Sequence, residues 1–146
     1  MRLVLFYLIL VVAQGFLAAL LAPIPPPDLF LLAVLTLLWR VPPWQLVLVA
    51  YGVGMLQDIV GSGVLGAHAF ALAAAALAGS MVRAQLSNAG TLERMLVVFV
   101  AGLGKWVVMG GVIVWLSGSV GSLGRAGAVA LVETVLTVAA GLLVLP

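Results

Sequence analysis

The sequence predicts an all-α, polytopic membrane protein with six transmembrane helices. Of its 146 residues, 66% are hydrophobic and only 7% are charged, and the mean hydropathy is +1.39. A soluble domain carries about 25% charged residues and could not cover this much apolar surface. Long apolar runs separated by proline-rich or glycine-rich breaks supply the helices. We expect one integral membrane domain, with no linker long enough to hold a soluble domain.

The composition also excludes several kinds of site. The chain has no cysteine, which rules out disulfides, thiolate metal sites and cysteine nucleophiles. Its single histidine cannot form a histidine metal cluster. The six basic residues form no run that would attract nucleic acid, and no set of nucleophile, base and orienting group can be assembled. We therefore expect no metal, no other cofactor and no enzymatic activity.

Residues 3–21 form the first apolar run, after Arg2. A secretory signal also begins with a charge, but this run is longer than a signal core, and residues 19–23 lack an A-x-A cleavage pattern. We expect a retained helix, because about 20 apolar residues cross the hydrocarbon of a bilayer. The four prolines among residues 23–27 require an extended turn. Asp28 then stands where it can cap the next helix.

The next two runs, residues 29–39 and 44–57, are short for a bilayer. The first would make only about 17 Å of helix at 1.5 Å per residue. Trp39 and Trp44 flank the proline-containing break between them, as aromatic residues do at a membrane interface. A re-entrant hairpin would leave the arginine of this break deep in the bilayer. We therefore expect two short crossing helices, shielded by longer neighbours or by local thinning.

Three further runs complete the six spans. The run at residues 65–82 is rich in alanine, and a small residue at every fourth position allows another helix to approach closely. The last two runs are long enough to cross the membrane. The expected spans are approximately residues 3–21, 29–39, 44–57, 65–82, 95–115 and 126–145.

Six spans place both termini on one side of the membrane. That side would carry Arg2, Arg40, Arg83 and Arg94, whereas the other would carry only Arg125. Cytoplasmic loops of membrane proteins are enriched in basic residues. We therefore expect a multi-pass protein of the bacterial inner membrane with both termini in the cytoplasm.

Residues 52–68 form the most unusual stretch, with five glycines, Gln57, Asp58 and the single histidine, His68. A titratable group beside a glycine-rich break in an apolar sequence marks buried protein surface or a polar cavity. We expect a helix–break–helix element. Asp58 and His68 either form a proton relay or ligand site, or Asp58 caps a helix end while His68 faces solvent or a neighbour. The sequence leaves both interpretations open.

A second pair of charges lies within the last two spans. Lys105 is ten residues before Trp115, and Glu133 is eight residues after Arg125. Both would lie about 12–15 Å deep on antiparallel helices. This arrangement predicts an intramembrane ion pair, for which a structural role is favoured over a transport site.

These motifs resemble those of the rod-shape-determining protein MreD, a bacterial inner-membrane family. The resemblance rests on the proline turn Pro25-Pro26-Pro27-Asp28-Leu29 and on two segments of the central stretch, Gly54-Met55-Leu56-Gln57-Asp58 and Gly63-Val64-Leu65-Gly66. Chain length and the six apolar runs also agree with this family. The second half of the chain adds little beyond hydropathy.

The resemblance implies a function that residue spacing alone does not give. MreD-like proteins are non-catalytic components of the elongasome, which directs side-wall peptidoglycan synthesis and so sets cell shape. They bind the bitopic protein MreC and, through it, MreB and RodA with its transpeptidase; self-association into a homo-oligomer stays open. Their helical core is similar to the substrate-binding subunit of energy-coupling-factor transporters, which implies a pocket or functional loop. Here that element would comprise Pro25, Pro27, Asp28, Gln57, Asp58, Gly61, Gly63, Gly66 and His68.

The alternative function is a substrate-binding subunit of a vitamin-type transporter. Such subunits dock on their energising partner through small-residue motifs, and the first span offers only Ala18 and Ala22 at that spacing. An enzyme acting on lipid-linked precursors is a more distant alternative.

Overall fold

The computed structural model describes residues 2–61, 64–86, 90–118 and 123–144. The regular secondary structure of these residues is entirely helical, which confirms the all-α prediction. The helices are α1 (Arg2–Leu21), α2 (Leu29–Thr36), α3 (Pro43–Val60), α4 (Ala67–Gln85), α5 (Thr91–Ser117) and α6 (Leu123–Val144).

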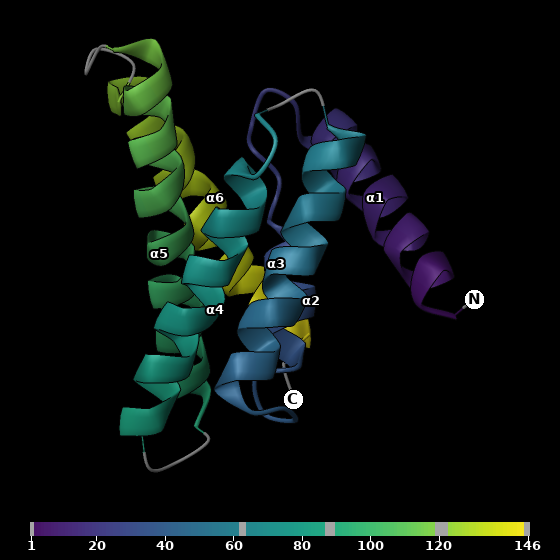
Figure 1. Ribbon diagram of the computed structural model, residues 1–146, viewed down its shortest axis with the longest axis vertical. Helices are drawn as coiled ribbons and strands as arrows, with labels where there is room; N and C mark the ends of the chain where they lie inside the picture. Colours follow the sequence, from purple (N-terminus) through teal and green to yellow (C-terminus); the bar gives the residue numbers. More distant parts are fainter. Residues whose placement is uncertain (1, 62–63, 87–89, 119–122, 145–146) are drawn as a thin grey trace.

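Successive helices run in alternating directions (Figure 1). The end of α1 and the turn at residues 64–66 therefore lie at one end of the molecule, which we call the upper end, and the segment between α1 and α2 leads down from there. The turn at residues 37–42 lies at the opposite, lower end, where α4 finishes and α5 begins. The helix α1 leans away from the other helices, and its Tyr7 ring packs on Phe30 of α2 with 5.8 Å between ring centroids.

Three of the described helices are long and apolar enough to cross a membrane. They are α4 (Ala67–Gln85), most of α5 (Thr91–Leu116) and most of α6 (Ala126–Leu143). A shorter apolar segment, Leu5–Leu21, lies in α1. These lengths and compositions support the membrane character predicted from the sequence.

The helix α2 is shorter than the expected run of residues 29–39. It ends at Thr36, and residues 37–40 form turns in which the Leu37 amide donates to the carbonyl of Val34 and the Arg40 amide to that of Leu37. Its eight residues cover about 12 Å. The chain is still apolar beyond Thr36, but Pro42 and Pro43 prevent a helix from continuing downstream. Hydropathy therefore overestimated the length of this helix.

The same short helix forms the centre of the core. Within the described chain, α2 packs against each of the other helices. Its residues are apolar on every side, and a helix of that kind is stable only when neighbours surround it. The buried side chains of α2 and of the turn that follows it are Phe30, Leu31, Leu32, Val34, Leu35 and Leu38.

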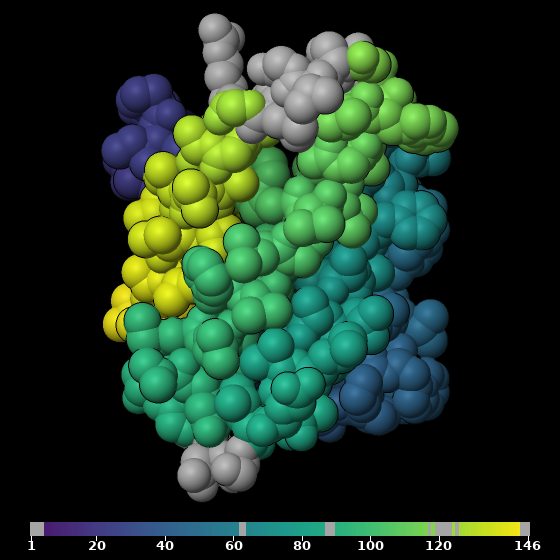
Figure 2. Space-filling view, turned by 90° about the vertical axis from the view of Figure 1, so that its left-hand side faces the viewer, coloured from purple at the N-terminus to yellow at the C-terminus, as the bar shows by residue number. Residues whose placement is uncertain are grey.

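The helices α3 to α6 lie side by side in chain order across the face shown in Figure 2. The small-residue stripe of α4 is buried at Ala67, Ala71, Ala75 and Gly79, as the spacing predicted. At Gly79, an added Cβ atom would lie 3.3 Å from the Leu35 side chain of α2 and 3.6 Å from Val97 of α5. The stripe is therefore a packing surface for its neighbouring helices.

Candidate functional site

The proline turn fastens α2 to two other helices. Asp28 caps α2, because its Oδ1 accepts a hydrogen bond of 2.9 Å from the amide of Leu31. The amide of Asp28 donates to the Thr137 hydroxyl of α6 (2.9 Å), and the amide of Leu29 donates to Gln14 of α1 (3.0 Å). The predicted cap is confirmed, and the same turn also joins the first and last helices.

The contact expected between Lys105 and Glu133 is present, and it has a third member. Lys105 Nζ lies 2.5 Å from Glu133 Oε1 and also 2.5 Å from Asp28 Oδ2. The side chains of Asp28, Lys105 and Glu133 are 5%, 8% and 16% exposed. We call these three residues the buried charge cluster. It joins the α2 cap to the middle of α5 and to α6.

The sequence does not identify Asp28 as the third member of this cluster. Asp28 and Lys105 are 77 positions apart, and the sequence predicts for Asp28 a capping role and a place in the pocket or functional loop. The short length of α2 is the signal that could have revealed the contact. Because α2 does not extend through the whole molecule, its first residue can lie at the depth of the middle of α5.

Asp58 lies near the end of α3 and caps the beginning of α4. Its Oδ2 accepts from the amides of Gly66 (2.8 Å) and Ala69 (3.2 Å), and its Oδ1 accepts from the amide of His68 (3.1 Å). These amides precede or begin α4, where a helix has no carbonyl partners of its own. The capping interpretation therefore describes Asp58, although the capped helix is the following one.

His68 faces Asp58 rather than solvent alone. Its Nδ1 lies 2.7 Å from Asp58 Oδ1, and its side chain is 32% exposed while that of Asp58 is fully buried. Asp58 and His68 therefore form one polar pair at the junction of α3 and α4.

The remaining residues of the predicted pocket have local roles in the turns. Gly66 adopts a left-handed conformation (φ +93°) just before α4, a conformation that glycine adopts without strain. Gly61 ends α3 and donates its amide to the carbonyl of Gln57 (2.8 Å). Pro25 and Pro27 are half-buried in the first turn. Gly63 lies outside the described residues.

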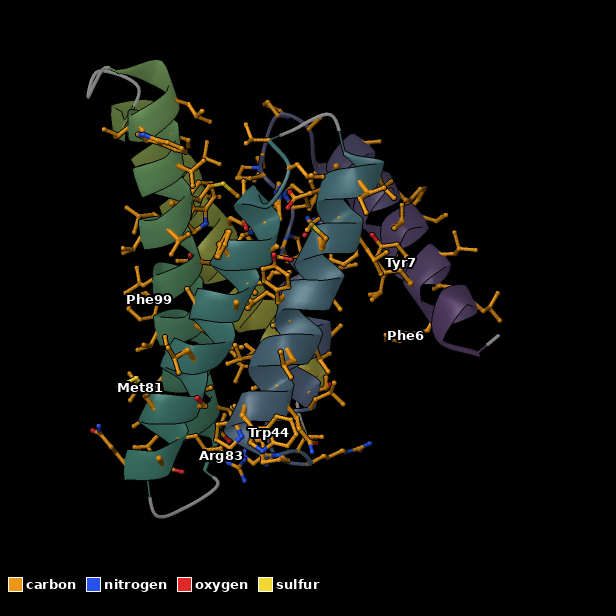
Figure 3. The ribbon with its side chains drawn as sticks, viewed as in Figure 1. Phe6, Tyr7, Trp44, Met81, Arg83 and Phe99 are labelled. Atoms are coloured by element: carbon orange, nitrogen blue, oxygen red, sulfur yellow. The ribbon has the colours of Figure 1, made fainter. Side chains whose placement is uncertain are left out.

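A cavity of about 380 Å³ lies at the lower end of the molecule. It is lined by Arg83 and Ser80 of α4 and by residues of the α2–α3 turn, and no residue of the predicted pocket contributes to it. The Arg83 guanidinium donates to the carbonyl of Leu38 and lies 5.9 Å from the Trp39 ring centroid. Figure 3 shows Arg83 and Trp44 together at this end. The arrangement is typical of a membrane interface with basic and aromatic side chains.

The described residues contain no group of three carboxylate, histidine or cysteine side chains that could hold a metal ion. Comparison of the chain with protein-family models, with curated proteins and with solved structures finds no match.

Proposed function

We propose that this chain is an MreD-like, non-catalytic component of the bacterial elongasome in the inner membrane. In this role it binds MreC and helps to direct side-wall peptidoglycan synthesis. The observation that carries the proposal is the position of the two motif acids. Asp28 and Asp58 stand in the two segments that resemble this family, and both connect helices. Motifs of this kind define a scaffold rather than a set of reacting groups.

The partners of the buried charges support a non-catalytic role. Asp28 and Glu133 are held by Lys105, and Asp58 is held by three backbone amides and His68. A catalytic acid or base needs access to its substrate. Here the carboxylates are instead engaged with neighbouring helices, which favours their use in holding the fold.

The alternation of helix direction supports six membrane passes, with α2 forming a short pass that packs against each of the longer helices. In this arrangement the lower end, with Arg40 and Arg83, is cytoplasmic, because basic residues are enriched on that side. Both termini are then cytoplasmic as well.

We assign the exposed face of α1 as the binding surface for MreC. It packs on the core mainly through α2, and it exposes large apolar side chains along its length, including Phe6, Val12 and Phe16. A single-span partner can bind such a surface through van der Waals contacts, which drive helix association in lipid.

Site-specific photo-crosslinking tests this proposal. A photoreactive amino acid at Phe16, whose side chain is 66% exposed, should crosslink to MreC in intact membranes. The same amino acid at Leu131 of α6, which is 59% exposed, is the matched control and should crosslink less. Copurification of a vitamin and an energising ATPase, with no MreC crosslink from either position, would instead assign the chain to a transporter.

A further inference from the structure

The buried charge cluster carries more negative than positive charge. Two carboxylates, of Asp28 and Glu133, contact the same ammonium group of Lys105 at 2.5 Å each. The two contacting oxygens can therefore be no farther apart than twice that distance. With all three groups ionised, the cluster would hold one uncompensated negative charge between α2, α5 and α6.

The neighbouring helices do not supply the missing positive charge. The helix α1 contributes the neutral Gln14 beside the cluster, and α6 contributes the neutral Thr137. The helix α4 carries His68, but the contact that its ring makes is with the fully buried Asp58. Among the described residues, Lys105 is the one cation in contact with the cluster.

An uncompensated charge in such surroundings is unfavourable. Removing a carboxylate from water costs several kcal/mol, by order of magnitude, unless a partner of opposite charge and good hydrogen bonds replace the water. When two carboxylates share one site, the negative charge of one also disfavours ionisation of the other. The smallest group that removes the excess charge is a proton.

The surroundings of the two carboxylates decide where this proton resides. Asp28 accepts from the Leu31 amide at the beginning of α2, where the helix dipole favours a negative charge. Within the described chain, the carboxylate of Glu133 has Lys105 as its one hydrogen-bond donor, and no helix N-terminus stabilises its charge. We infer that the buried charge cluster is a proton-binding site and that Glu133 carries the proton, with Asp28 and Lys105 remaining charged.

Infrared spectroscopy of the purified protein in lipid nanodiscs tests this site directly. A protonated carboxyl group has a C=O stretching band that is separate from the bands of a carboxylate. The chain has only four Asp and Glu residues, so the variants Asp28→Asn, Asp58→Asn, Glu93→Gln and Glu133→Gln cover every acidic side chain. We expect the wild type to show this band at neutral pH, and we expect Glu133→Gln alone to remove it.

Two results would overturn the inference. One is a wild-type spectrum without a protonated carboxyl band, which would leave the cluster charged or assign its compensation to a cation from a partner protein. The other is a band that survives in Glu133→Gln. Should Asp28→Asn or Asp58→Asn not fold, as judged by circular dichroism, the wild-type and Glu133→Gln spectra still decide the question. Neither spectrum depends on the proposed role in cell-wall synthesis.

Discussion

At the scale of single residues, Asp58 shows how one side chain can serve two helices. It belongs to α3, but its carboxylate accepts hydrogen bonds from three backbone amides at the beginning of α4. In the interior of a membrane protein no water replaces such an acceptor. Asp58, an unusual residue in an apolar sequence, is therefore needed to cap the helix that begins after the glycine-rich break.

We expect Asp58→Ala to lower the melting temperature in detergent. The substitution leaves buried amides without an acceptor, and each such loss costs about 1–3 kcal/mol. His68→Ala is the matched control, because it removes one partner of Asp58 but leaves the amide contacts intact, and it should cost less. An Asp58→Ala protein with wild-type stability but without MreC binding would instead make this acid part of the partner site.

The same reasoning applies to Lys105, whose loss would strand Asp28. We expect Lys105→Met to destabilise the protein strongly, since breaking a buried pair from one side typically costs about 3–5 kcal/mol. Glu133→Gln should be mild, because the amide resembles the protonated acid.

A double-mutant cycle separates pairing from simple polarity. In detergent melting experiments, Lys105→Met combined with Asp28→Asn should be less damaging than the sum of the two single changes. Strict additivity of the two effects would contradict the contact between Lys105 and Asp28.

At the scale of helices, α3 and α4 approach each other closely at Gly54. A Cβ atom at this position would lie 2.5 Å from the Cα atom of Ala69 and 2.5 Å from the carbonyl oxygen of His68. Both are backbone atoms, so no side-chain rotation can relieve the clash. The glycine thus fixes the distance between the two helices and, with it, the contact of Asp58 with the beginning of α4.

We therefore expect Gly54→Ala to destabilise the protein by about 1–3 kcal/mol, the usual cost of overpacking a core. Gly52→Ala is a close control on the same helix, because a Cβ atom there meets nothing within 4 Å. That control should be neutral or stabilising by up to about 1 kcal/mol, since alanine favours a helix more than glycine. Equal melting temperatures for the two variants would show that the helices can separate without cost.

At the scale of the whole molecule, the basic residues and the helix directions together define an orientation. Arg40 and Arg83 lie at the lower end, whereas α1 ends and the proline turn begins at the upper end. The proposed inner-membrane topology places the lower end in the cytoplasm.

Cysteine labelling in intact cells can test this orientation, and the chain has no native cysteine to interfere. A membrane-impermeant thiol reagent should label Ile24→Cys at the upper end from outside the inner membrane. It should label Gln85→Cys at the lower end only after the inner membrane is permeabilised. Both positions are exposed. Labelling of Gln85→Cys from outside would contradict the proposed six passes with cytoplasmic termini.

The sequence by itself determined the features that depend on neighbouring residues. Apolar composition indicated a membrane protein, and prolines and glycines marked where helices end, because these residues act on the local backbone. The capping role of Asp28 was predicted because a cap acts on amides a few residues away. The pairing of Lys105 with Glu133 could also be predicted, since distance from the helix ends indicates depth.

Only the tertiary structure decided which distant segments meet. It placed the shortest helix, α2, at the centre of the core, and it brought Asp28 to Lys105 across 77 positions of sequence. It also gave Asp58 the following helix to cap. Contacts of this kind depend on how far each helix extends and how closely its neighbours approach. A difference of a few residues in the length of α2, which hydropathy does not resolve, changes the depth at which Asp28 lies.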